Sequence, residues 1–304
     1  MRLFNRPDRT GRLLKAFRTN FLFLISDGAY PPHRQQRLYQ WCQKVGLDWA
    51  QARAYVVPEA TAFLQSVIQR SVNDGVIAPE EMQNLHRLRR RLGLPEDVEP
   101  MVRLYDLVER KIEHLLIERA AYLSEEQVVQ RLMEQIGAYH LPKDRQERLQ
   151  RLLQQQHTYA RLMAGILPVI AAPIDLPDGE VCHDYREISF IEASAAARHS
   201  GTGYLAVTCK RVMTLAPQGG NATYWHDIRH IQLHADRAVQ VVTTTSNLFL
   251  YCDELQYLAT LLIGALRHYT QRIVPPPPPN KRLVRERDDE GKTKARTSIM
   301  GSAL

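Results

Sequence analysis

The stretch NDGVIAPEEMQNLHRLRRRLGL, residues 73–94, decides the fold of the N-terminal half, because an earlier stretch has the same plan. SDGAYPPHRQQRLYQWCQKVGL, residues 26–47, aligns with it without a gap at an offset of 47 residues, matching at Asp-Gly, Pro, Leu and Gly-Leu. Each copy predicts a turn, a helix with proline in its first turn, and a glycine that ends the helix. A third, weaker copy at 123–144 lacks the Asp-Gly turn, and its HLPKD matches GLPED. We therefore expect a helical repeat.

The sequence changes character after Pro168, which predicts a second domain. Up to about residue 167 the apolar residues recur at helical spacing, as in MVRLYDLVERKIEHLLIERAAYL. Later, GYLAVTCKRVMTLAP predicts two strands around a Thr-Cys-Lys-Arg turn, and CDELQYLATLLIGALRHYTQRI predicts one amphipathic helix. The predicted fold class is α+β with two domains: an all-α helical repeat, then a small β-barrel or sandwich capped by a C-terminal helix.

Composition divides the chain further. We expect a basic arm at 1–20, the helical domain at 21–167, a proline-rich linker at 168–177, the β-domain at 178–274, and a polyproline linker with a disordered basic tail at 275–304.

The net charge of +7 is concentrated in the two terminal segments. Residues 1–20 hold six basic residues and one acidic residue, and residues 275–304 hold seven and four, so the middle is near neutral. A near-neutral folded region argues against a nucleic-acid partner. Four separated cysteines without a CxxC pair and no run of 18 apolar residues favour a cytoplasmic protein without a spanning helix, with a peripheral location at the inner face of the membrane as the alternative.

The Asp-Gly turn of the second copy resembles half of a calcium-binding EF-hand loop. With Gly75 at loop position 6, Asp74 and Glu81 occupy positions 5 and 12, but Arg70 and Val72 occupy positions 1 and 3. A calcium ion needs six to eight oxygen ligands, and the first copy offers fewer still. We therefore favour a structural turn and expect no metal and no cofactor, with Asp74 and Glu81 as the remaining metal candidates.

The motif DGVIAPEEMQNLHRLRRRLGL resembles the repeat of the tellurite-resistance TerB-like helical domain, built around D-G-x-I-x-x-x-E. The resemblance covers roughly residues 20–165. It implies paired helix–turn units in which acidic residues can bind a metal. Asp74 and Glu81 match the motif in the second copy. In the first copy Asp27 matches and Arg34 replaces the glutamate, so a shared metal site would lose a ligand.

The second half resembles bacterial pleckstrin-homology-like and GRAM-like domains. The similarity lies in LPDGEVCHDY, GTGYLAVTCKRVMTL, HDIRHIQLHADRAVQVV and LFLYCDELQYLATLL, over about residues 174–270. Thr208, Lys210 and Arg211 fall on the T-x-K-R positions of that pattern. The resemblance implies two nearly orthogonal sheets capped by a C-terminal helix, and a lipid, peptide or protein docking module without catalysis.

Two groups of cations are candidates for docking a partner or a lipid. One is the turn pair Lys210 and Arg211, which could instead be a solvated hairpin turn. The other is the amphipathic arm, which could lie on an anionic membrane surface or dock on its own helical domain. Its candidate residues are Arg2, Arg12, Lys15 and Arg18.

Two further clusters have simpler interpretations. His226, His230 and His234 are spaced by four, which would suit zinc on a helix, but the stretch predicts strands, so we expect structural or surface histidines. RLRRRLG, residues 87–93, places cations at a helix C-terminus, where they interact favourably with the helix dipole. No nucleophile–base pair, Walker motif or HExxH motif is present.

These features lead to three hypotheses about function. The first is a non-catalytic adaptor, related to bacterial stress systems through the resemblance alone, whose pleckstrin-homology-like domain docks a partner protein or a membrane. The second is a peripheral membrane protein recruited by its basic N-terminal arm. The third is a metal-dependent sensor or enzyme that uses Asp74 and Glu81. The sequence leaves the oligomeric state open.

Overall fold

The computed structural model describes residues 9–72, 77–194, 198–217, 219–234, 237–271, 285–287 and 293–295. The chain divides into two compact units, residues 1–161 and residues 162–304, called the helical unit and the β unit below. The fold class predicted from the sequence is confirmed: a repeated all-α unit is followed by an antiparallel β unit that ends in a helix.

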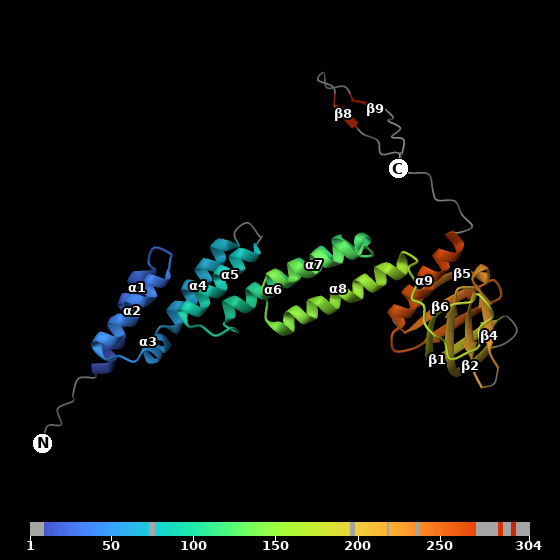
Figure 1. The fold of residues 1–304 in the computed structure, drawn as a ribbon, viewed down its shortest axis with the longest axis horizontal. Coiled ribbons are helices and arrows are strands. Elements are labelled where there is room, and N and C mark those ends of the chain that lie inside the picture. Colours follow the sequence, from blue (N-terminus) through green and yellow to red (C-terminus); the bar gives the residue numbers. More distant parts are fainter. Residues whose placement is uncertain are drawn as a thin grey trace. The chain divides into compact units, whose positions relative to one another are not determined.

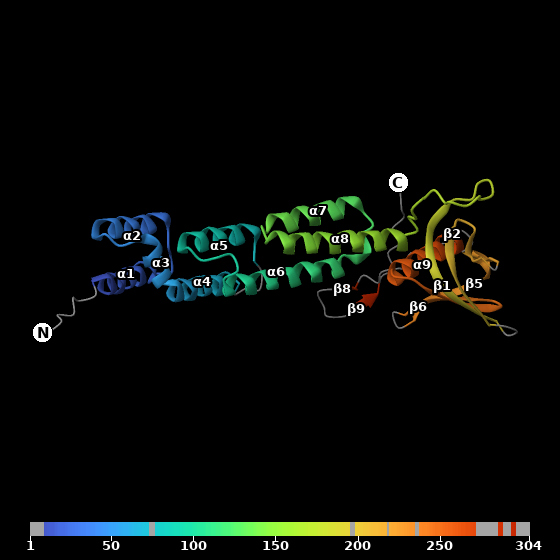
Figure 2. The ribbon, with the colours of Figure 1, turned by 90° about the horizontal axis from the view of Figure 1, so that it is seen from below.

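The helical unit consists of helices that pack in pairs. Helix α1 lies beside α2 and α4 lies beside α5, while α8 lies along α6 and α7 (Figure 2). The helices are α1 (Arg9–Ile25), α2 (Pro32–Val45), α3 (Trp49–Tyr55), α4 (Val57–Ser71), α5 (Pro79–Leu92), α6 (Glu99–Glu118), α7 (Glu126–Ala138) and α8 (Lys143–Met163), with a 3-10 turn at Ala120–Tyr122.

The 47-residue repeat is visible in the helix boundaries. Helices α2 and α5 both begin at the aligned prolines and both end before the aligned glycines, Gly46 and Gly93. Both glycines have left-handed φ angles, 72° and 74°, a region in which a side chain is costly. The third copy places His140 at this position with φ 49°. The weaker third copy therefore keeps the same backbone turn without the glycine.

Equivalent positions of the repeat form the core of the helical unit. Leu38, Leu85 and Leu132, each 47 residues apart, are all buried on α2, α5 and α7. Helix α1 belongs to this core as well, because Phe17 and Phe21 are buried. It runs across the boundary predicted at residue 20, so residues 9–20 of the predicted arm are part of a packed helix.

The β unit is a seven-stranded antiparallel sheet in the order β4-β3-β2-β1-β7-β6-β5, followed by helix α9, which packs on β5 and β6 (Figure 1). The elements are β1 (Cys182–Ser194), β2 (Arg198–Thr208), β3 (Arg211–Leu215), β4 (Asn221–Tyr224), a 3-10 turn (Trp225–Asp227), β5 (Ile228–His234), β6 (Ala238–Thr243), β7 (Ser246–Tyr251) and α9 (Leu255–Gln271).

The long strand β1 joins the two halves of the sheet. Its whole length pairs with β2, and its C-terminal part, Ser189 to Ser194, also pairs with β7. Apolar residues from both halves of the sheet pack together with α9 in one core, as expected for a sheet capped by a C-terminal helix. The main contributors are Leu205, Val207, Val239, Val241, Leu250, Leu258, Leu261 and Leu262.

Two short strands lie in the segment that we predicted to be disordered. β8 (Arg285–Arg287) and β9 (Thr293–Ala295) pair antiparallel with each other and form a separate two-stranded sheet.

Candidate functional site

The Asp-Gly loop of the first repeat already contains a cation, the guanidinium of Arg34. Its Nη1 donates to Asp27 Oδ1 at 2.5 Å and to the carbonyl oxygen of Ala29 at 2.9 Å, and its Nη2 donates to Asp27 Oδ2 at 2.5 Å. The hydrogen bonds from Arg34 to the carboxylate, together with one from the backbone nitrogen of Ala29 at 3.1 Å, lower the pKa of Asp27 to about 2. Arg34 stands at the position of Glu81 in the second repeat, and its guanidinium is bound to both carboxylate oxygens of Asp27.

In the second repeat the motif glutamate has a structural role. Glu81 Oε2 accepts a hydrogen bond from the backbone nitrogen of Ala78 at 2.9 Å, which caps the first turn of α5. The other metal candidate, Asp74, lies outside the described residues. In the part of the chain that the structure describes, no three His, Cys, Asp or Glu side chains gather in a way that could hold a metal ion.

The predicted Thr-Cys-Lys-Arg turn connects β2 to β3 and is fixed by Thr208. Thr208 is fully buried, and its Oγ1 accepts hydrogen bonds from the backbone nitrogens of Lys210 and Arg211 at 3.2 and 3.1 Å. The same hydroxyl lies 2.6 Å from Glu180 Oε1. Trp225 Nε1 donates to the carbonyl oxygen of Thr208 at 3.0 Å. The threonine of the motif therefore shapes the turn.

The two cations of this turn are in different environments. Arg211 donates from Nε and Nη2 to Glu180 at 3.1 and 3.3 Å, and the Glu180 side chain is only 2% exposed. This hydrogen bonding raises the pKa of Arg211 above its ordinary value. Lys210 is exposed. A phosphate group at this turn would meet one exposed lysine and would compete with a buried carboxylate for Arg211.

The sequence reasoning missed the role of Glu180. Glu180 lies in LPDGEVCHDY, one of the stretches that carry the pleckstrin-homology-like resemblance, which was the available signal, but its partner Arg211 is 31 residues away along the chain. Only the fold brings the two together.

Three of the four predicted cations of the arm lie on α1. Arg12 and Lys15 are exposed, whereas Arg18 forms an ion pair with Glu59 on α4. Arg2 lies outside the described residues. Close to the C-terminal end of α1, Leu22 and Phe23 are exposed, Phe23 by 78%. The exposed surface of α1 thus combines cations with two apolar side chains.

The predicted histidine cluster is spread over the edge of the β unit. His226 lies in the 3-10 turn, and His230 and His234 lie on β5; all three are exposed. Strand β5 pairs only with β6 among the described strands, so its other side is an open edge of the sheet. The other edge is formed by the four residues of β4.

Cys182 and His183 adjoin in sequence but do not form a nucleophile–base pair. The Cys182 thiol is buried and donates to the carbonyl oxygen of Asp184, and burial raises its pKa. His183 Nδ1 lies 2.6 Å from the carbonyl oxygen of Pro168, and its Nε2 lies 3.1 Å from the Tyr269 hydroxyl. Both ring nitrogens are thus engaged in structural contacts.

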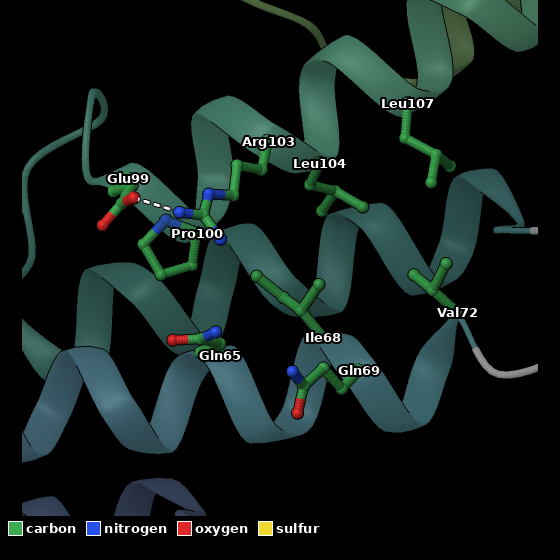
Figure 3. Close-up of a pocket in the computed structure, with 9 residues that line it drawn as sticks. All are labelled: Gln65, Ile68, Gln69, Val72, Glu99, Pro100, Arg103, Leu104 and Leu107. Atoms are coloured by element: carbon green, nitrogen blue, oxygen red, sulfur yellow. Dashed lines mark hydrogen bonds and ion pairs between the residues drawn. The ribbon is translucent and has the colours of Figure 1, made fainter.

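A groove of about 490 Å³ opens between α4 and α6 in the helical unit (Figure 3). Its floor is apolar, formed by Ile68 and Leu104, and its polar groups include an ion pair between Glu99 and Arg103. The remaining lining residues are Gln65, Gln69, Val72, Pro100 and Leu107. The groove offers apolar contact area, and its arginine is already paired.

Comparisons with known proteins do not assign the chain to a family. No protein-family model matches it. No curated protein matches it either. Among solved structures, the C-terminal domain of an unknown protein from Leishmania infantum is 16% identical over 29% of this chain and 85% of that chain, with a TM-score of 0.24. The apo structure of an activated truncation of Vav1 is 10% identical over 87% of this chain and 77% of that chain, with a TM-score of 0.27. Likenesses this distant carry no argument about function. Among the described helices, none has both the length and the apolar character needed to cross a bilayer.

Proposed function

We propose that the chain is a non-catalytic adaptor that docks an extended, acidic segment of a partner protein along strand β5 of its β unit. The open edge of β5 is the observation that carries the proposal. An unpaired edge presents backbone N–H and C=O groups to which another polypeptide can add as a strand. With seven residues, β5 offers a longer edge than the four residues of β4.

The charge of β5 supports an acidic partner. The strand carries Arg229, His230 and His234 and no acidic residue, and these three side chains are exposed. Helix α9 packs on β5 from the core side, which holds the strand in place. Ile231 and Leu233 anchor it by packing partly buried against the core. Backbone pairing would supply affinity, while the positive charge of Arg229 and the hydrogen-bonding histidines favour acidic segments.

Two sequence resemblances support the proposal: the pleckstrin-homology-like and GRAM-like pattern in the β unit, and the TerB-like pattern in the helical unit. The TerB-like resemblance extends the proposal to a role in a bacterial stress response. In this scheme the helical unit assembles or recruits a further component.

The test is a selection of short random peptides displayed against the full-length protein. We expect the selected peptides to be rich in Asp and Glu, and to lose binding to His230→Glu, which places a negative charge on β5. Ala222→Glu puts the same charge on the exposed β4 edge and serves as the matched control. Binding that survives His230→Glu, or that is lost equally in Ala222→Glu, would argue against docking on β5.

A second candidate function is recruitment to an anionic membrane surface through α1. It is favoured by the exposed Leu22 and Phe23 on the helix that carries Arg12 and Lys15. Deleting residues 1–20 is a poor test, because the deletion removes the buried Phe17 and would disturb the core.

The sharper test is Phe23→Ser together with Lys15→Glu, compared with the wild type in sedimentation with vesicles of phosphatidylserine and phosphatidylcholine at low and high salt. Salt-sensitive binding that the variant loses supports recruitment through α1. Absence of binding at low salt, or unchanged binding of the variant, contradicts it.

A further inference from the structure

A cationic concavity of about 450 Å³ lies against α5 in the helical unit, far in sequence from β5; we call it the α5 pocket. Gln83, His86, Arg87 and Arg90 occupy successive positions on one face of the helix, at the spacing i, i+3, i+4 and i+7. The other lining residues are Arg89, Glu96 and His140. Three arginines face one glutamate, so the lining carries an excess of positive charge.

The helix dipole accounts for only part of this arginine cluster. Arg89 Nη1 donates to the carbonyl oxygen of Leu94, just beyond the C-terminus of α5, at 3.3 Å. Arg91 Nη1 donates to the carbonyl oxygen of Tyr30 in the first repeat at 2.8 Å. Arg87 and Arg90 are exposed, and in the part of the chain that the structure describes they contact no carbonyl oxygen; the side chain of Arg87 donates to Asn84 Oδ1 at 3.5 Å. Among the described residues, neither forms an ion pair. Their charge is available to a ligand.

A buried polar atom beside the pocket lacks a partner. His86 is 6% exposed, lines the pocket, and its Nε2 has no hydrogen-bond partner among the described residues. Its ring stacks on Tyr105, with centroids 5.8 Å apart. Burial and the nearby Arg89 lower the pKa of His86. Leaving a buried polar atom unpaired costs free energy, so such an atom marks a place where a ligand or water is bound.

The third repeat closes the pocket from another direction. His140 follows α7 and has the left-handed φ of 49°, which turns the chain at the position of Gly46 and Gly93 in the other copies. Gln83 Nε2 donates to His140 Nε2 at 2.8 Å, and this hydrogen bond joins the two repeats at the pocket. The pocket is therefore built from α5, the loop that follows it, and the loop after α7.

We propose that the α5 pocket binds a phosphate-type oxyanion, with Arg87 and Arg90 as its charged ligands and His86 as a buried hydrogen-bond donor. A tetrahedral phosphate offers several acceptor oxygens to guanidinium groups, and such charge-assisted hydrogen bonds are among the stronger ones in proteins. The pocket volume leaves space for an organic group attached to the phosphate. The binding is noncovalent and involves no reaction.

The internal repeat supplies conservative variants for the test. The residues of the first copy at the positions of Arg87 and Arg90 are Gln40 and Gln43, 47 residues earlier, and α2 forms with them. The double variant Arg87→Gln/Arg90→Gln therefore gives α5 the glutamines that α2 already has at the equivalent positions. A matched control is Arg37→Gln/Arg110→Gln, which removes the same charge from exposed positions outside the pocket.

The experiment titrates inorganic phosphate into the full-length protein at constant ionic strength, set with sodium chloride, and follows binding by calorimetry and by the NMR signals of the histidine rings. The wild type and the control variant are expected to bind saturably with a shift of the His86 signal. The pocket variant should bind at least about tenfold more weakly, since each lost charge-assisted hydrogen bond is worth that factor or more. Thermal unfolding establishes that the variants are folded.

A second arm replaces free phosphate with vesicles that contain phosphatidic acid, which distinguishes a soluble phosphate from a lipid head group. The probe that the wild type binds more tightly, and that the pocket variant fails to bind, shows whether the natural ligand is a soluble phosphate or a lipid head group. The proposal is overturned if neither probe binds saturably, or if the pocket variant and the control variant lose affinity equally, because the effect would then be one of net charge.

Discussion

The ion pair between Glu180 and Arg211 is expected to stabilise the β unit. A strong ion pair would leave Arg211 unavailable to a ligand, so its strength is worth measuring. Glu180 Oε1 and Oε2 accept from Arg211 at 3.1 and 3.3 Å, and Oε1 also contacts Thr208 at 2.6 Å. The Glu180 side chain is 2% exposed and that of Arg211 is 20% exposed. Removing one partner of a fully buried pair costs about 3–5 kcal/mol. Because Arg211 is partly solvated, we expect Glu180→Ala to cost about 2–4 kcal/mol.

A double-mutant cycle of Glu180→Ala and Arg211→Ala isolates the interaction. We expect a coupling free energy of about 1–3 kcal/mol. The matched control is the exposed pair of Glu99 and Arg103 on α6, whose side chains are 70% and 68% exposed. That pair should contribute no more than about 0.5 kcal/mol.

The assay is urea unfolding of the full-length protein followed by tryptophan fluorescence. The chain has three tryptophans, of which Trp225 alone lies in the β unit, so Trp41→Phe and Trp49→Phe make the signal specific for that unit. The control pair lies in the helical unit, so its cycle is followed with Trp41 and Trp49 in a Trp225→Phe background. A specific probe is needed because a chain of two units does not unfold in a single two-state step. A coupling free energy no larger than that of the control pair would refute the reasoning and leave Arg211 available for a ligand.

Three further changes test the local structure. Arg34→Gln should raise the pKa of Asp27 from about 2 toward 3.8 in a carboxyl NMR titration, and an unchanged pKa would contradict the account of the loop. The lowered pKa of the wild type gives stability that is present above pH 3.8 and is lost as the pH falls to about 2, so the variant should lack this contribution. Gly264→Ala would place a Cβ 1.9 Å from the carbonyl oxygen of Leu162, so we expect a loss of about 1–3 kcal/mol in urea unfolding, and a neutral result would mean that α9 can shift. In Gly46→Ala the added Cβ would meet no atom of the described residues within 4 Å, so the variant should cost only about 1 kcal/mol through the φ of 72°, and a larger loss would contradict this.

The sequence predicted those features that depend on local chemistry. The aligned prolines set the starts of α2 and α5, because proline favours the first turn of a helix. The aligned Gly46 and Gly93 set their ends, because glycine readily adopts the left-handed conformation that ends a helix. Thr208 and its neighbours predicted the turn between β2 and β3 in the same way. These features are read from a few adjacent residues.

The features that the sequence did not predict depend on contacts between distant segments. The pairing of Arg211 with Glu180 joins residues 31 apart, and the α5 pocket combines α5 with His140, 57 residues after Gln83. The packing of α1 was one of the two alternatives predicted for the basic arm, docking on its own helical domain, and it is confirmed for residues 9–20, because Phe17 and Phe21 lie in the core of the helical unit.

The open edge of β5 is tested most directly by amide hydrogen exchange of the full-length protein with and without a peptide obtained from the display selection. Strand addition would hydrogen-bond the outward-facing amides of β5, so the account predicts that exchange slows in residues 228–234 and stays unchanged in β4 at the opposite edge. Protection confined to the helical unit, or to β4, would contradict the proposal that β5 is the docking strand.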